Sequence, residues 1–332
     1  MGRIRVAFLL VIASSLQAGY LIRYFQADAN SENMLLKASN DMMSELTKEA
    51  DNPFRLAHHE SDGFFQDIKA EDWSRLKQKV REIHPNTLTR LTPSQLRKRR
   101  INANVFFQDY FEPNFNCMHE RRIGRRGDGG KWVCDPHRID ASYNNATGEA
   151  SCLVYSVGSN GDVSFEDAVK KEIGSHCEIH SFDIANYSAK VEAVGAHFHQ
   201  WGIAAEAKVN RKGVFKTLPQ TIQELGHEGR TIDIFKIDCE GCEWSSFSSF
   251  FQANVTLRQI LVELHAAPNR KDPKSKFQPM PMPETMDFFD SLMKHGYVIF
   301  HKEINIRFWH FGQCIEYAFL KLHPDFFDWM RG

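Results

Sequence analysis

The segment LVYSVGSNGD, at residues 153–162, is the best guide to the architecture of this chain. Its first half is mostly apolar and predicts a short buried strand. Its two glycines allow the backbone to turn sharply and to approach a ligand without a Cβ in the way. Apolar residues then recur at helical spacing, at Phe165, Ala168, Val169 and Ile173. A strand, a glycine turn and a helix therefore follow one another, and the first amides of that helix offer hydrogen-bond donors to a ligand.

The same alternation of strand-like and helix-like segments continues toward the C-terminus. Helices are predicted at residues 191–198 and 285–294, and strands at residues 177–182, 232–237, 259–264, 297–301 and 314–320. Strands that alternate with helices indicate a parallel, doubly wound α/β sheet with right-handed crossovers. The last two strands follow each other directly, so they can form a hairpin at the edge of that sheet.

Polar residues stand at the ends of the predicted strands, where open α/β sheets bind their ligands. Asp183 follows the strand at 177–182, and an acidic side chain there can accept hydrogen bonds from both hydroxyls of a ribose. The strand at 232–237 leads into Asp238, Glu240 and Glu243. Carboxylates at that place suit a cationic centre or the acceptance of a proton.

These motifs together resemble a known family. Residues 158–162 (GSNGD), 181–183 (SFD) and 237–244 (IDCEGCEW) resemble the FkbM-like methyltransferases, above all the branch typified by methyltransferase-like protein 24. Residues 124–134, GRRGDGGKWVC, resemble a cysteine-containing segment of that branch. The resemblance covers residues 107–327. It implies a Rossmann-like, seven-stranded methyltransferase sheet with S-adenosylmethionine as the methyl donor.

The resemblance also implies roles for individual residues. The donor would be held by the glycine turn and by two aspartates, namely Gly158, Ser159, Asn160, Gly161, Asp183 and Asp238. Within this set the glycines face the amino-acid end of the donor, Asp183 faces the ribose, and Asp238 lies near the methyl group. A hydroxyl acceptor needs a proton acceptor within hydrogen-bond reach. The candidates near strand ends are Asp238, Glu240, Glu243 and His265.

Simpler explanations exist for some of these residues. His265 is also explained as a structural histidine whose hydrogen bonds are satisfied at a strand end. Glu263, inside the same strand, is expected to pair with a buried basic group or with the backbone. Asp238 and Glu240 are two carboxylates without an obvious third oxygen ligand, so no metal is assigned to them.

Cysteines predict covalent links. Two disulfides are predicted, one between the starts of neighbouring strands and one across a basic loop, Cys152–Cys177 and Cys117–Cys134. Cys239 and Cys242 are expected to form a local disulfide or to stay as thiols, since a second such pair for structural zinc is absent. Cys314 is left unpaired. The basic loop at residues 121–130 is either a surface loop or a lid whose arginines favour an anionic substrate.

Residues 1–25 contain an apolar stretch that follows Arg3 and Arg5, close to the lower limit of about 17 residues for a membrane-spanning helix. This segment is either an uncleaved signal-anchor or a cleaved signal peptide. The anchor would place the rest of the chain in the lumen of the endoplasmic reticulum or Golgi, and cleavage would allow secretion. Residues 26–104 are predicted to form a polar, partly helical stem, and residues 105–332 the methyltransferase domain.

The predicted stem has some internal features. Helices are expected around residues 35–46, at residues 73–83 and from Thr92 onward. Residues 97–100, RKRR, are either a solvated helix face or a cleavage site for luminal proteases. Glycosylation sequons begin at Asn145, Asn186 and Asn254, which is compatible with the secretory route.

Composition narrows the classes of function. The chain has 332 residues, 42% of them hydrophobic, which suffices for one sizeable core. A formal net charge of −1 provides no electrostatic argument for nucleic acid as a partner. A nicotinamide-dependent oxidoreductase would need glycines where Asn160 and Val163 stand. We therefore expect a membrane-anchored O-methyltransferase that acts on a hydroxyl of a glycan or small molecule. The alternative is a non-catalytic binding or scaffold protein of the same fold; the oligomeric state stays open.

Overall fold

The computed structural model describes residues 52–83, 111–141, 152–265, 267–268, 277–278, 282–305 and 314–331. The chain divides into two compact units, residues 1–55 and 56–332. Several predicted features lie outside the described residues, namely the apolar segment at 1–25, the helices near residues 35–46 and Thr92, the basic run at 97–100 and the sequon at Asn145. Among the helices that the structure describes, none combines the length and apolar character that a membrane crossing requires.

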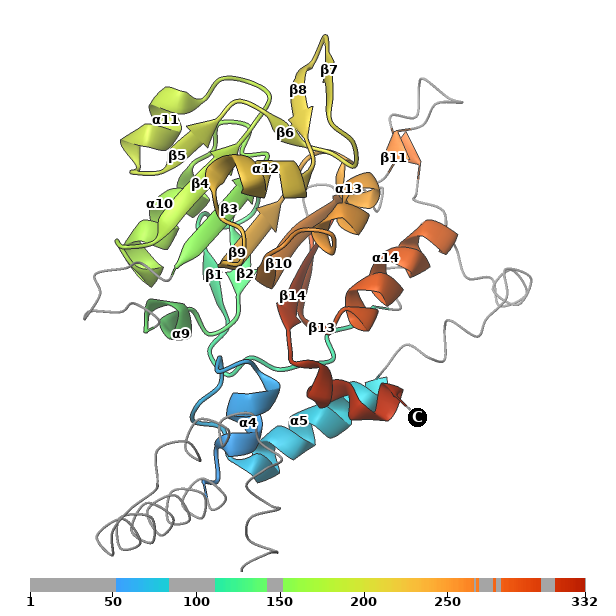
Figure 1. The fold of residues 1–332 in the computed structure, drawn as a ribbon. Coiled ribbons are helices and arrows are strands. Elements are labelled where there is room, and N and C mark those ends of the chain that lie inside the picture. The colour runs from blue at the N-terminus through green and yellow to red at the C-terminus, as the bar shows by residue number, and fades with distance from the viewer. Residues whose placement is uncertain are drawn as a thin grey trace, which may run out of the picture. The chain divides into compact units, whose positions relative to one another are not determined.

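A seven-stranded sheet forms the centre of the unit at residues 56–332 (Figure 1). Its strand order is β13-β14-β10-β9-β3-β4-β5. The bounds are β3 (Leu153–Val157), β4 (Glu178–Phe182), β5 (His197–His199), β9 (Thr231–Ile237), β10 (Thr256–His265), β13 (Tyr297–Ile304) and β14 (Cys314–Lys321). Strands β10, β9, β3, β4 and β5 pair in parallel, whereas β14 is antiparallel to both β10 and β13. The predicted doubly wound, seven-stranded sheet is confirmed, and so is the hairpin at its edge.

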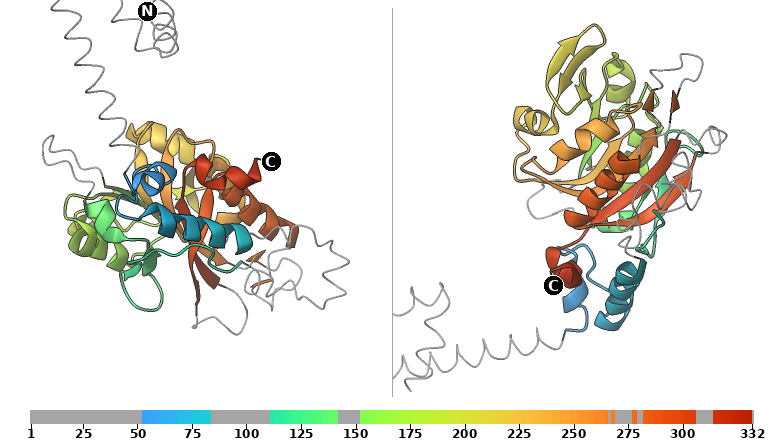
Figure 2. Two further views of the ribbon diagram at one scale, coloured as in Figure 1. Left: turned by 90° about the horizontal axis from the view of Figure 1, so that it is seen from below. Right: turned by 90° about the vertical axis from the view of Figure 1, so that its right-hand side faces the viewer.

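Helices cover both faces of the sheet (Figures 1 and 2). One face packs against α9 (Pro136–Asp140), α10 (Ser164–Ala168), the π-helical turn η2 (Val169–Ile173) and α11 (Ser188–Ala193). The other packs against α12 (Leu218–Leu225), α13 (Glu243–Phe250) and α14 (Met282–Lys294). Side chains alternate along a strand, so Val154 enters the first core and its neighbour Tyr155 enters the second.

Sequence periodicity is misleading for the segment at 191–198. Val191 lies in α11 as predicted, but Phe198 lies on strand β5. The helix ends because Gly195 adopts a positive φ of 74°, a common way for glycine to stop a helix. A small sheet was also not predicted, built from β6 (Gly202–Ile203), β7 (Lys208–Asn210) and β8 (Gly213–Lys216). Its strands have between two and four residues, too few for an alternating pattern to be recognised.

Residues 56–83 pack within the same core as the sheet. They include most of α4 (Arg55–Glu60) and all of α5 (Ala70–Ile83), a helix predicted from its apolar spacing and confirmed here. The indole of Trp73 is fully buried, and its ring centroid lies 5.4 Å from those of Phe65 and Phe326 and 6.0 Å from that of Phe115. Phe326 belongs to the C-terminal 3-10 helix η4 (Pro324–Met330), which lies beside α4 and α5 (Figure 2). The compact unit therefore begins well before residue 105.

Covalent links agree with the predictions. Disulfides join Cys117 to Cys134, Cys152 to Cys177 and Cys239 to Cys242, with Cα–Cα distances of 5.4, 4.6 and 5.4 Å. Cys314 is free. The first disulfide joins the two ends of a hairpin formed by β1 (Arg121–Ile123) and β2 (Lys131–Val133). A further pair of two-residue strands, β11 (Ala267–Pro268) and β12 (Phe277–Gln278), follows β10.

Candidate active site

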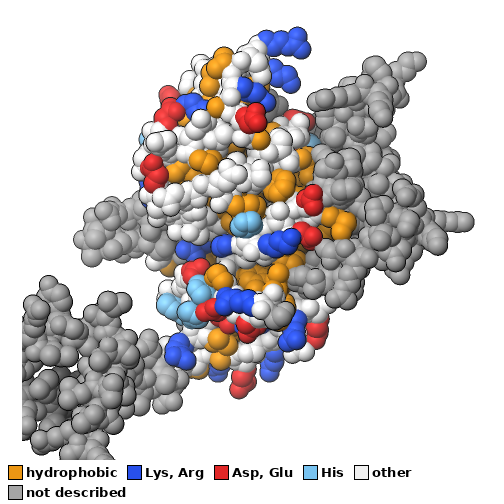
Figure 3. All heavy atoms as spheres, turned by 45° about the vertical axis from the view of Figure 1, so that its right-hand side comes forward, with side chains coloured by type: hydrophobic (Ala, Val, Ile, Leu, Met, Phe, Trp, Pro, Cys, Tyr) orange, Lys and Arg blue, Asp and Glu red, His pale blue; other side chains and the backbone are white. Residues whose placement is uncertain are grey.

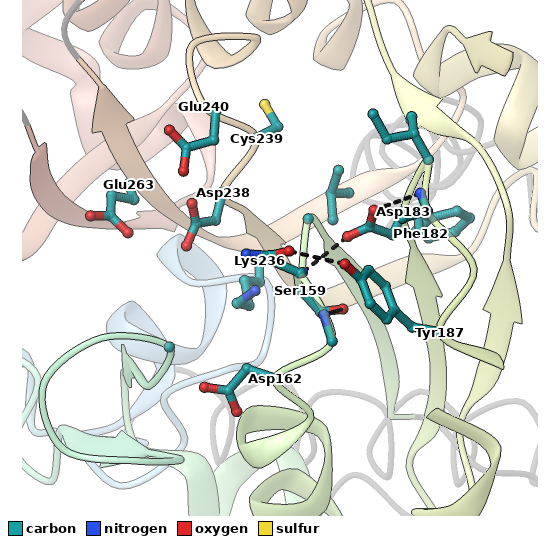
Figure 4. Close-up of a pocket in the computed structure, with 18 of the residues that line it drawn as sticks. Ser159, Asp162, Phe182, Asp183, Tyr187, Lys236, Asp238, Cys239, Glu240 and Glu263 are labelled. Atoms are coloured by element: carbon teal, nitrogen blue, oxygen red, sulfur yellow. Dashed lines mark hydrogen bonds between the residues drawn. The ribbon is translucent and has the colours of Figure 1, made fainter. Parts of the chain in front are cut away.

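A cavity of about 1470 Å³ lies at the carboxyl ends of β3, β4 and β9 (Figure 4). The chain runs from β3 to β4 and β5 on one side, and then continues with β9 and β10 on the other side of β3. The strand order therefore reverses between the neighbouring strands β3 and β9. Open α/β sheets bind ligands at this point, because the loops from the two halves diverge and leave a crevice.

The turn after β3 brings the two halves of the sheet into contact. Gly158 has a φ of +77°, and a Cβ on it would lie 1.8 Å from the carbonyl oxygen of Asp238. No side chain can be accommodated there without displacing the end of β9. Gly161 has a φ of +75°, and its Cβ would lie 2.7 Å from the ring of Tyr187. Both glycines are therefore required by backbone conformation, and Gly158 also by space, because its close neighbour is a backbone carbonyl.

Asp183 lies on the opposite side of the cavity from the acidic residues after β9 (Figure 4). Its Oδ2 accepts a hydrogen bond of 3.0 Å from the amide of Asn160, and its Oδ1 accepts one of 3.0 Å from the amide of Ala185. The hydroxyl of Tyr187 donates to the Asn160 side chain at 3.0 Å. A carboxylate has about four acceptor positions. Asp183 can therefore hold the glycine turn in place and still accept hydrogen bonds from a ligand.

Lys131 is a buried neighbour of the site that sequence reasoning missed. It comes from β2, is 2% exposed, and places its Nζ 3.2 Å from Asp238 Oδ2, 3.4 Å from Glu263 Oε2 and 2.5 Å from Glu316 Oε1. The expectation that Glu263 pairs with a buried basic group is thereby confirmed. No local pattern identifies Lys131, because its partners are supplied by strands far away in the sequence.

Nearby positive charges keep the carboxyl group of Asp238 ionised. Burial opposes ionisation of this carboxyl, but the nearby charges of Lys131, Lys236 and His265 lower its pKa to about 2. Burial likewise opposes the charge on Lys131, yet the carboxylates around it raise the pKa of the lysine. Burial raises the pKa of Glu316 to about 8, so this residue carries a proton at neutral pH. The cluster thus presents the charged carboxylate of Asp238 to the cavity.

His265 lies at the end of β10 and lines the cavity. Its Nδ1 is 3.1 Å from Glu243 Oε1, and its Nε2 is 3.8 Å from a carboxylate oxygen of both Asp238 and Glu240. Burial alone would lower the pKa of His265, but hydrogen bonds with Cys314 and Glu243 raise it. The imidazole is therefore a cation at neutral pH, which makes it unsuited to accept a proton from a substrate.

Glu243 and Glu240 have opposite environments. Glu243 is fully buried, accepts a hydrogen bond of 2.8 Å from the amide of Cys239, and does not line the cavity. Glu243 therefore lies behind the cavity wall, where it positions His265 and the turn after β9. The side chain of Glu240 is 80% exposed and lines the cavity. The other predicted site residues, Gly158, Ser159, Asn160, Gly161, Asp183, Asp238 and His265, also line it.

Two hairpins complete the cavity wall. In the β1–β2 hairpin, the predicted basic loop, Arg125 lines the cavity and pairs with Asp162 at 2.8 Å. From the β7–β8 hairpin, which no sequence pattern revealed, Lys212 and Phe215 line the cavity. The exposed Lys208 and Arg211 stand near the tip of this hairpin, where Figure 3 shows basic side chains, and elsewhere on that face acidic and basic side chains are interspersed.

No curated protein matches the chain. Solved structures similar to it include the fibrillarin pre-rRNA processing protein of Methanococcus jannaschii, with 10% identity, a TM-score of 0.33 and coverage of 63% of this chain and 85% of that one. Another is 1,6-didemethyltoxoflavin-N1-methyltransferase of Burkholderia thailandensis, with 11% identity, a TM-score of 0.33 and coverage of 63% and 99%.

A family model described as a methyltransferase domain, Methyltransf_22, matches residues 55–321. The match begins where the compact unit begins and includes the seven-stranded sheet, the glycine turn and the acidic residues after β9. The chain therefore belongs to this methyltransferase family.

Proposed function

We propose that this protein is an S-adenosylmethionine-dependent methyltransferase whose donor binds in the cavity at the switch point of the sheet. The observation that carries the proposal is the glycine turn after β3, packed against the end of β9 and held by Asp183 from the end of β4. The cavity of about 1470 Å³ exceeds the roughly 300–1,000 Å³ of a typical ligand pocket. It has room for a donor together with part of an acceptor.

The residues present fit this donor. Because Gly158 has no Cβ, the backbone of the glycine turn can approach the amino-acid end of the donor. Asp183 retains acceptor positions for the hydroxyls of the ribose. The ionised Asp238 faces the cavity, where a negative charge stabilises a sulfonium cation. When bound, the donor supplies an electrophilic methyl group, so the protein has mainly to align the acceptor and to remove its proton.

We further propose a hydroxyl acceptor, as the resemblance to the FkbM-like branch implies. The proton released on methylation needs a base within hydrogen-bond reach. Asp238 has a lowered pKa and is a weak base, His265 is already protonated, and Glu243 is buried behind the wall. Glu240, exposed in the cavity, is the carboxylate that this reasoning favours as the proton acceptor.

Donor affinity provides the test. With the full chain, titration calorimetry should detect binding of S-adenosylmethionine, and Asp183→Ala should weaken it at least about tenfold, because a hydrogen bond to a charged group contributes roughly 1.5–3 kcal/mol. Glu192→Gln, on the exposed side of α11, is the matched control and should leave the affinity unchanged. Melting curves without donor show whether each variant is folded.

The outcomes separate the alternatives. Wild-type affinity in Asp183→Ala would remove the proposed ribose contact. Absence of donor binding to the wild type would overturn the enzyme proposal and favour the non-catalytic binding or scaffold protein. Where the donor binds, transfer of a labelled methyl group to hydroxyl-bearing glycans tests the proposed acceptor class.

We also propose that the protein functions inside the secretory pathway, anchored by the segment at residues 1–25 or secreted after its cleavage. The disulfides of the compact unit support this, since such links persist in oxidising compartments. The sequon residues Asn186 and Asn254 are exposed, as glycosylation would require. In sealed microsomes the chain should resist added protease and become sensitive once detergent opens the membrane. Digestion without detergent would contradict the luminal placement.

A further inference from the structure

A cluster of metal-ligating side chains lies away from the donor cavity. Glu178 and His180 come from β4, and His227 follows α12 just before β9. None of these residues lines the cavity, and Glu178 stands at the amino end of its strand whereas the cavity lies at the carboxyl ends. We call Glu178, His180 and His227 the Glu178 cluster.

The three side chains converge on one point. Oε1 of Glu178 is 2.9 Å from Nε2 of His180 and 3.2 Å from Nε2 of His227, and the ligand atoms all lie within 4.8 Å of one another. A tetrahedral zinc ion with bonds of about 2.0–2.2 Å separates its ligand atoms by roughly 3.3 Å. The distances from Glu178 Oε1 to the two imidazole nitrogens are already close to this value, so rotations of the side chains would let the three ligand atoms surround an ion.

Residues outside the cluster form hydrogen bonds with its remaining polar atoms. Nδ1 of His180 is 2.8 Å from Nε2 of His199, and Nδ1 of His227 is 2.7 Å from the hydroxyl of Tyr155. Metal-binding histidines almost always engage their second ring nitrogen in such a bond, which fixes the orientation of the ring. Arg230 donates to Oε2 of Glu178 at 2.7 Å, so Oε1 is left to face the two imidazoles.

The chemical types of the side chains suit a cation as well. A metal ion binds a carboxylate in its ionised form and an imidazole in its neutral form. The side chain of Arg230 is 34% exposed, so water screens its opposing charge.

We infer that the Glu178 cluster is a binding site for a divalent transition-metal ion of the zinc type, with His180, His227 and Glu178 as ligands. Imidazole and carboxylate ligands together suit zinc and its neighbours in the first transition row. The side chain of Glu178 is 28% exposed, which provides access from solvent and a fourth position for water. The ion would link β4 to the connection between α12 and β9 and so stabilise the fold outside the active site.

A rival group among the described residues fits less well. His59, His323 and Asp325 also lie close enough to hold an ion. However, Nδ1 of His323 accepts a hydrogen bond of 3.1 Å from the amide of Asp325, and Arg331 occupies Oδ1 of the same aspartate at 2.9 Å. Nδ1 of His323 is therefore already engaged by the backbone, which makes His323 a suitable control.

Metal binding to the full chain tests the inference. After removal of metals with a chelator, the protein should bind Zn²⁺ by calorimetry, melt at a higher temperature with it, and develop visible absorption bands with Co²⁺. His227→Gln and Glu178→Gln should each weaken Co²⁺ binding by roughly a hundredfold, and Tyr155→Phe by about tenfold, because it removes only the bond to the second ring nitrogen. His323→Gln should bind Co²⁺ like the wild type.

The results decide between a metal site and a plain hydrogen-bond network. Absence of Co²⁺ bands in the wild type, or equal binding by the wild type and both ligand variants, would overturn the inference. Weaker binding in His323→Gln alone would move the site to the rival group. Melting curves in chelator identify any variant that fails to fold, and Tyr155→Phe keeps the test decisive in that case because it preserves the ligands.

Discussion

Replacement of Lys131 by methionine is expected to lower the free energy of unfolding by about 3–5 kcal/mol, the usual effect of removing one partner from a buried ion pair. The lysine is 2% exposed, and its Nζ contacts the carboxyl groups of Asp238, Glu263 and Glu316 together. Methionine has a similar length but no charge, so the variant keeps the packing and loses the cation. Urea unfolding followed by circular dichroism measures the change.

The loss should depend on pH in a definite direction. Folded Glu316 keeps its proton up to a pKa of about 8, whereas a carboxyl of the unfolded chain releases it near 4.3. The folded state thus binds more protons between these values, and stability falls as the pH rises through them. Without Lys131 the carboxyl pKa values rise further. The destabilisation should therefore be larger at about pH 8 than at about pH 5.

An exposed lysine provides the control for this experiment. Lys171 pairs with Asp167 on the surface at 2.6 Å, and Lys171→Met should change the stability by less than about 1 kcal/mol at either pH. A stability loss in Lys131→Met no larger than in Lys171→Met would show that the carboxylates do not depend on the buried cation.

Replacement of Trp73 by alanine is expected to lower the free energy of unfolding by about 3–5 kcal/mol, as for other large aromatic side chains in cores. The indole is fully buried among the rings of Phe65, Phe115 and Phe326, and its Nε1 donates to Glu60 Oε2 at 2.7 Å. Alanine would leave a cavity between α5 and the C-terminal 3-10 helix. Urea unfolding of the full chain gives the value.

Two further variants make this result specific. Trp73→Phe retains most of the packing and should be affected less than the alanine variant. Ile83, on the same helix but 42% exposed, should tolerate alanine within about 0.5 kcal/mol. A small effect of Trp73→Ala would mean that residues 56–83 contribute little to the core and that the predicted stem reaches residue 104.

The central sheet could be predicted because its signals are local. Short apolar runs separated by helical spacings identify β3, β4, β9, β10, β13 and β14, and the glycines after β3 locate the turn at which a ligand binds. The pairing of Cys152 with Cys177 followed from the same reasoning, since both stand before the strands of one crossover unit. Where a strand is very short, as in β5 to β8, the pattern fails because too few residues alternate.

Contacts between distant segments required the tertiary structure. Lys131 meets Asp238, Glu263 and Glu316 only because a disulfide-closed hairpin places β2 over the sheet. The hydrogen bonds with Cys314 and Glu243 that make His265 a cation, and the burial that sets Glu243 behind the cavity wall, depend on neighbours from different elements. The sequence of this protein thus established the sheet, the glycine turn and the acidic strand ends of its cavity. Protonation and burial in that cavity emerged only from the folded chain, because charge and solvent access depend on what lies nearby in space rather than along the backbone.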